Sequence, residues 1–173
     1  FDGCPTGTTA VTGLERTCLL EGTYTQDLTL TNDAIYVLSG GVFIGNKAAE
    51  GEPVPTDGPT LTIEAGTRII GSGGSNNALY IQRGSKIIAD GLPHAPIVMT
   101  GPDYAPDATS GQWGGLVING FAPVGADTGE REGEGETGFF GGIDHRNADA
   151  VFNAGQGIEK LQLGGDAGAG HDV

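Results

Sequence analysis

Residues 61–91 read LTIEAGTRIIGSGGSNNALYIQRGSKIIADG, and this stretch contains one pattern twice. Residues 61–73 are matched eighteen residues later by residues 79–91, with Leu, Ile, Gly, Ile, Ile and Gly at corresponding places. The polar positions keep their character too, since Arg68 corresponds to Lys86. An internal repeat of this kind is the sequence signature of stacked structural units. We therefore expect the rest of the chain to lie on either side of this pair in one stack.

Each copy of the repeat predicts a strand, a glycine corner and a second strand. Leu61 and Ile63 alternate with polar residues, as in a half-buried strand. Gly66 then falls where the chain must turn or approach a neighbour closely. A copy is too short for a βαβ unit, which needs about 30 residues. The repeat thus predicts one coil of a parallel β-solenoid per copy, with Arg68 and Lys86 one coil apart on the same face.

Length and composition agree with an all-β stack in a single domain. At about twenty residues per coil, the chain has room for roughly six to eight coils. Glycine accounts for 33 of the 173 residues, without the three-residue period of collagen. The formal net charge of −14 disfavours binding to nucleic acid or to anionic membrane surfaces. No apolar run approaches eighteen residues, so we expect no membrane span.

The two cysteines, Cys4 and Cys18, flank a turn-rich segment near the start of the sequence. An even number of cysteines near one end indicates a disulfide formed in an oxidising compartment, and the alternative is two free thiols in a cytosolic protein. We expect residues 1–22 to form a disulfide-closed N-terminal cap, and residues 23–173 to form the solenoid. The first residue, Phe1, is expected to be a processed or trimmed start.

Three polar segments interrupt the pattern and predict loops that project from the coils, at residues 46–59, 101–111 and 126–138. The sequence ends in a Gly-rich segment, residues 164–173, in which we see no amphipathic helix to cover the last strand. Three explanations remain open: a neighbouring molecule covers that strand, the sequence is a fragment of a longer protein, or the Gly-rich segment itself folds over the end. A head-to-tail contact that does not close would generate a filament.

Three segments resemble a family of secreted bacterial cell-surface proteins, often hypothetical lipoproteins or adhesin-like proteins: residues 61–74 (LTIEAGTRIIGSGG), 78–101 (ALYIQRGSKIIADGLPHAPIVMTG) and 111–124 (GQWGGLVINGFAPV). Together they cover about a third of the chain. The family has the pectin-lyase-like architecture. The resemblance implies a right-handed parallel β-helix and a location outside the cell or on the bacterial cell surface. It supplies no catalytic motif for the residues of this chain.

Acidic side chains in the third loop are candidates for a Ca²⁺ site, because this cation takes six to eight oxygen ligands. The candidate ligands are Asp127, Glu130, Glu132, Glu134 and Glu136. Their spacing does not match an EF-hand loop, and the alternative is a solvated loop. Calcium is the one cofactor that the sequence suggests.

Two further residues, Trp113 and Arg83, are candidates for contact with a carbohydrate. An exposed Trp113 side chain would stack on a sugar ring, whereas a packed one would cover a coil corner between its glycine neighbours. A polysaccharide hydrolase needs two carboxylates about 5–9.5 Å apart, and no such catalytic set stands out. We therefore predict a structural or adhesive protein rather than an enzyme, with other copies of itself or an extracellular polysaccharide as its partner. The alternative is a β-helix module that binds or cleaves carbohydrate, in the manner of a polysaccharide lyase.

Overall fold

The computed structural model describes residues 1–49, 51–53, 56–102, 110–122, 130–133, 139–141 and 158–160. Within these residues the secondary structure consists of strands, and no helix is long and apolar enough to cross a membrane. The largest sheet holds β1 (Thr9–Ala10), β2 (Thr17–Tyr24), β4 (Ile35–Ile44), β6 (Arg68–Gly71), β7 (Ala78–Ile81), β9 (Val98–Thr100) and β10 (Gly115–Ile118). The second sheet holds β3 (Leu28–Leu30), β5 (Thr60–Ile63), β8 (Lys86–Ala89) and β13 (Ile158–Lys160). A separate antiparallel pair is formed by β11 (Glu130–Glu132) and β12 (Phe139–Gly141).

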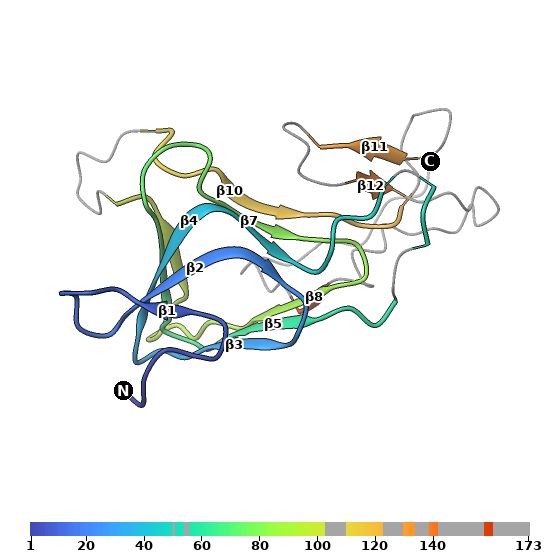
Figure 1. Ribbon diagram of the computed structural model, residues 1–173. Coiled ribbons are helices and arrows are strands. Elements are labelled where there is room, and N and C mark those ends of the chain that lie inside the picture. Colours follow the sequence, from blue (N-terminus) through green and yellow to red (C-terminus); the bar gives the residue numbers. More distant parts are fainter. Residues whose placement is uncertain are drawn as a thin grey trace.

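The two larger sheets are built by parallel pairing between successive passes of the chain. β2 pairs with β4, while β3 pairs with β5 and β5 with β8. The long strand β4 bends in Figure 1, and β6 pairs with its first half while β7 pairs with its second half. One full pass therefore consists of a segment on each half of the bent sheet and a segment on the second sheet. Parallel stacking of this kind is the expected β-helix arrangement.

Buried side chains stack on their register partners along the two sheets. Three such ladders run through the core: Cys18–Tyr36–Ile69–Met99, Ile44–Ile81–Ile118 and Leu28–Leu61–Ile87. Their last members Met99 and Ile118 are partly buried and pack against the core. Full burial of one Leu or Ile side chain stabilises the fold by about 1.5–3 kcal/mol, so these ladders supply much of the cohesion between passes.

The coil length expected from the sequence repeat is wrong for most of the described stack. Leu28 pairs with Leu61, 33 residues later, and Leu61 pairs with Ile87, 26 residues later. The two copies of the repeat do not lie on each other, because Leu61 belongs to β5 while Leu79 belongs to β7 in the other sheet. Each copy is a strand–corner–strand unit, and the two copies form consecutive parts of one winding of the chain. The estimate of six to eight coils assumed about twenty residues each. Among the parallel pairings of the described strands, the pairing of β2 with β4 is the one with so short a separation.

Arg68 and Lys86 do not form the predicted cation ladder for the same reason. Arg68 pairs with Ile35 and Val98 in the bent sheet. Lys86 pairs with Thr60 in the second sheet. The two side chains therefore belong to different faces of the stack.

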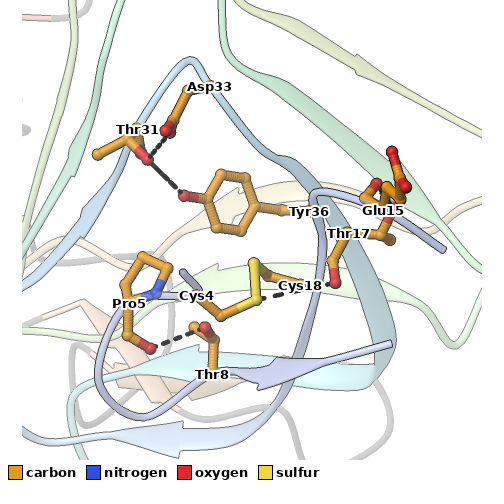
Figure 2. Close-up of a disulfide and its surroundings, with 9 residues drawn as sticks. All are labelled: Cys4, Pro5, Thr8, Glu15, Thr17, Cys18, Thr31, Asp33 and Tyr36. Carbon is orange, nitrogen blue, oxygen red and sulfur yellow. Dashed lines mark hydrogen bonds between the residues drawn. A yellow bond between two sulfur atoms is a disulfide. The ribbon is translucent and has the colours of Figure 1, made fainter. Parts of the chain in front are cut away.

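The predicted disulfide between Cys4 and Cys18 is confirmed (Figure 2). Its two Cα atoms are 5.6 Å apart, and Cys18 is fully buried at the start of the first core ladder. The bridge ties the N-terminal segment to β2, where β1 adds an antiparallel pairing at Cys18 and Leu19. β2 runs across residue 22, at which the N-terminal cap was expected to end.

A short hydrogen-bond chain lies next to the disulfide and fixes the buried side chain of Tyr36 (Figure 2). The Tyr36 hydroxyl accepts a bond of 2.9 Å from the backbone N–H of Thr31. The Thr31 hydroxyl donates to Asp33 Oδ1 at 2.6 Å. This bond is the main reason that the pKa of the Asp33 carboxyl is lowered from its ordinary value. The corner between β3 and β4 is thus held by side chains as well as by backbone.

Candidate functional site

A polar pocket lies where three chain corners stack between the bent sheet and the second sheet. Its volume is about 530 Å³, within the range of small-molecule sites. The first corner joins β2 to β3, the second joins β4 to β5, and the third joins β7 to β8. The corner pocket is lined by residues 25–27 from the first, 45, 46 and 57–59 from the second, and 83 and 85 from the third.

Backbone hydrogen bonds continue the parallel pairing through these corners and hold them in register. Gly45 N–H donates to Tyr24 C=O at 2.8 Å, and Gln82 N–H donates to Ile44 C=O at 2.9 Å. Gly58 N–H donates to Gly84 C=O at 2.8 Å. The pocket wall is therefore part of the rigid stack.

The inner wall of the corner pocket consists of Arg83 and Ser85, which are 4% and 1% exposed. Ser85 is buried because Gly45 and Gly58 lie close to it. A Cβ added at Gly45, where φ is +88°, would collide with Ser85 Oγ. A Cβ at Gly58 would lie 2.7 Å from the Gly84 carbonyl oxygen and 3.0 Å from Ser85 Oγ. Glycine is thus required at both positions by space, and at Gly45 also by backbone conformation.

The outer rim of the pocket is polar and open to solvent. Thr25, Gln26, Asp27, Asn46 and Asp57 are all exposed there. Asp27 is anchored, because its Oδ1 atom accepts a bond of 2.8 Å from the backbone N–H of Thr60. The carboxylates that solvent reaches are at the rim, whereas the guanidinium of Arg83 belongs to the buried wall. A ligand that approaches from outside meets negative charge first.

The corner pattern and the parallel stack agree with the comparison to known families. A family model described as a pectate-lyase like beta helix domain matches residues 22–153. The chain belongs to this family. The match spans most of the 173 residues and begins within β2. Neither the curated proteins nor the solved structures give a significant match.

In this pectate-lyase-like β-helix domain the two residues suggested for carbohydrate contact lie in different places. Arg83 lines the corner pocket, and Trp113 is absent from the residues that line it. Trp113 is partly buried, packs against the core and covers Gly71, where an added Cβ would collide with the Trp113 Cβ. A carbohydrate site that combines both side chains is not assembled by the described residues.

The β-helix domain carries an aromatic pair on β4 and β7, the strands that lead into the second and third corners of the pocket. Phe43 and Tyr80 are register partners whose ring centroids are 4.8 Å apart, with an interplanar angle of 13°. Lys47 Nζ lies 4.2 Å from the centroid of the Phe43 ring. Tyr80 thus covers one face of the Phe43 ring and Lys47 lies over the ring as well, so Phe43 presents little free ring face for stacking on a sugar.

The predicted calcium ligands fall mostly outside the described residues. Glu130 and Glu132 lie on β11, and the Glu132 side chain is exposed. Asp127, Glu134 and Glu136 lie outside the described part. Among the described residues, no three His, Cys, Asp or Glu side chains are grouped so that they could hold a metal ion. The calcium site in this loop stays a prediction.

Sequence reasoning missed most of the pocket, and one signal pointed toward part of it. The repeat aligns Ser85 with Thr67, and both are buried at corners, with 1% and 0% exposure. The Thr67 hydroxyl donates to Leu30 C=O at 3.3 Å, whereas Ser85 Oγ is buried without a hydrogen-bond partner. A small hydroxyl after a corner glycine therefore indicates a buried position. No comparable signal identifies Gln26, Asn46 or Asp57.

Proposed function

We propose that this protein is an extracellular structural or adhesive β-helix subunit, with its strands wound in a right-handed parallel helix. The observation that carries the proposal is the continuous stacking of buried side chains across parallel passes of the chain, which suits a rigid element. The Cys4–Cys18 disulfide is consistent with an oxidising environment and supports a location outside the cytoplasm. We assign the protein no catalytic role.

Self-assembly by head-to-tail contact is the finer part of this proposal. Among the described strands, β3 ends its sheet and pairs on one side only, with β5. An unpaired strand edge is a template for another chain, and a repeated end-to-end contact produces a filament. Calcium held by the acidic segment of residues 126–138 would bridge adjacent molecules.

Light scattering with negative-stain imaging, first with Ca²⁺ and then with chelator, tests the assembly. Rods much longer than one chain are expected in Ca²⁺, with shorter particles in chelator. Monodisperse monomers under both conditions would rule out the filament. Rods that persist in chelator would retain self-assembly and remove calcium from it.

A second candidate function is carbohydrate binding, and the corner pocket is the observation that favours it. Carboxylate, amide and hydroxyl side chains converge there on a space of about 530 Å³. These groups pair well with vicinal sugar hydroxyls, which both donate and accept hydrogen bonds. Calorimetric titration with soluble oligosaccharides of neutral, acidic and basic character tests this function. Heat changes indistinguishable from buffer in every titration would exclude it.

A further inference from the structure

We propose that the corner pocket binds an amino sugar and recognises its charged ammonium group through Asp27 and Asp57. This inference rests on the second candidate function, carbohydrate binding, and names the class of sugar. Three observations support it: the carboxylates lie at the exposed rim while Arg83 lies in the buried wall, most of the lining side chains are polar, and the chain as a whole is negatively charged.

The charges in the corner pocket favour a cation. Among the described residues that line the pocket, the ionisable side chains are Asp27, Asp57 and Arg83, and the two carboxylates are the exposed ones. The chain as a whole carries a formal net charge of −14, which attracts cations and repels acidic saccharides. An ammonium group offers three donors and no acceptor, which matches carboxylates that only accept.

The remaining lining favours a compact, hydroxyl-rich molecule over a lysine or arginine side chain of a peptide. Thr25, Gln26 and Asn46 present hydroxyl and amide groups that both donate and accept hydrogen bonds. Among the described residues that line the pocket, Pro59 is the one with a wholly apolar side chain, and none is aromatic. The ring hydroxyls of a sugar would use these hydrogen-bonding groups, whereas a long aliphatic stem would leave them without partners.

The fixed geometry of the pocket strengthens this recognition. Asp27 is held by the backbone N–H of Thr60, so its carboxylate is oriented before a ligand arrives. The corners are joined by backbone hydrogen bonds from Gly45 and Gly58. Less side-chain and loop ordering is then required on binding.

Calorimetric titration of the whole chain with a glucosamine tetramer tests the proposal, with the N-acetylglucosamine tetramer and a galacturonate tetramer as comparisons. The titrations are carried out at about pH 6, where the amine of the glucosamine tetramer is protonated. We expect the glucosamine tetramer to bind roughly tenfold more tightly than its N-acetylated counterpart, because one charge-assisted contact is lost on acetylation. The galacturonate tetramer is expected not to bind.

Matched single-charge variants distinguish recognition by the pocket from attraction by the net negative charge of the chain. Asp57→Asn is expected to weaken glucosamine binding roughly tenfold. Asp90→Asn changes the net charge equally at an exposed position outside the pocket lining, and it is expected to leave the affinity unchanged. Asp27→Asn keeps an oxygen for the Thr60 N–H and should weaken binding as Asp57→Asn does, with its unfolding midpoint measured alongside.

Each other outcome overturns a defined part of the reasoning. Equal affinity for the acetylated and free tetramers would retain carbohydrate binding and remove the ammonium preference. Equal effects of Asp57→Asn and Asp90→Asn would show attraction by the net charge, not by the pocket. A tetralysine peptide that binds as tightly as the glucosamine tetramer would remove the preference for a sugar. No binding by any saccharide would reject both the inference and carbohydrate binding, while the structural role would be unaffected.

Discussion

Replacing Gly45 by alanine tests how the corner pocket is built. Gly45 has φ +88°, and an L-residue in the left-handed region costs about 1–2 kcal/mol. The new Cβ would also collide with Ser85 Oγ, and overpacking a well-packed site typically costs about 1–3 kcal/mol. The two effects together predict a loss of about 2–5 kcal/mol in the free energy of unfolding, a large part of the roughly 5–15 kcal/mol typical of a domain.

Two further variants separate the conformational effect from the collision. Gly40 has φ +70°, and a Cβ there would meet nothing within 4 Å, so Gly40→Ala should show the conformational cost alone. The double variant Gly45→Ala/Ser85→Ala removes the colliding oxygen but leaves the Ser85 Cβ 3.3 Å from the new methyl group. We expect it to recover about 1–2 kcal/mol relative to Gly45→Ala, because Ser85 Oγ is also a buried hydroxyl without a hydrogen-bond partner.

Guanidinium unfolding followed by circular dichroism measures these differences, and the fluorescence of the single tryptophan, Trp113, tests whether the transition is two-state. Gly45→Ala must be more destabilising than Gly40→Ala, and the double variant must be less destabilising than Gly45→Ala. Equal losses for Gly45→Ala and Gly40→Ala would refute the close approach of Ser85. A double variant no more stable than Gly45→Ala would show that the strain lies in the backbone alone.

Three other perturbations have defined expected results. Replacing Cys4 and Cys18 by alanine should lower the free energy of unfolding by about 3 kcal/mol. A reductant should lower the stability of the wild type and leave that of the variant unchanged. Equal stability of the wild type with and without reductant would contradict this prediction. Tyr36→Phe removes the acceptor of a backbone N–H and should cost about 1–3 kcal/mol in thermal or chemical unfolding, and a neutral result would mean that water replaces the hydroxyl. Two pKa shifts predict opposite pH limits. The pKa of Asp33 is lowered in the folded state, so its contribution to stability is present above about pH 4 and is lost as the pH falls through the folded-state pKa. Burial raises the pKa of Tyr24, so its contribution is present below about pH 10 and is lost as the pH rises through the folded-state pKa. Carboxyl NMR and tyrosinate absorbance, with Asp33→Asn and Tyr24→Phe as controls, measure the two titrations, and unshifted midpoints would contradict them.

Much of the architecture was accessible from sequence because the relevant signals are local. Alternation at Leu61 and Ile63 predicts a half-buried strand, and β5 has that burial pattern. Gly66 and Gly84 both adopt positive φ at corners, as the repeat suggested. The disulfide was accessible because two cysteines near one end have few alternatives in an oxidising compartment. These features require no knowledge of which strand lies next to which.

The coil length was not accessible because a strand–corner–strand unit has the same chemistry wherever it falls in a winding. The units that contain Gly66 and Gly84 each place an apolar strand, a glycine and a buried hydroxyl in the same order. One leads from the second sheet into the bent sheet, and the other leads back. Pairing is decided by contacts between distant segments, such as Leu61 with Ile87, and a local pattern contains no information about that distance.

The corner pocket could not be predicted from the sequence, because it depends on which connections lie next to each other. The lengths of these connections also explain where the pocket lies. Residues 25–27 and 82–85 connect their strands tightly, whereas residues 45–59 form a long connection between β4 and β5. The described part of that long connection returns to the stack through Gly58 and Pro59, which pair with Gly84 and Lys86 and so form one wall of the pocket. A long corner stacked between two short ones therefore creates a concave surface without disturbing the core ladders on either side. Because the side chains of the core ladders come from the strands, the polar residues of the corners are not needed for core packing. We therefore expect differences in ligand specificity between proteins of this fold to lie mainly at the corners.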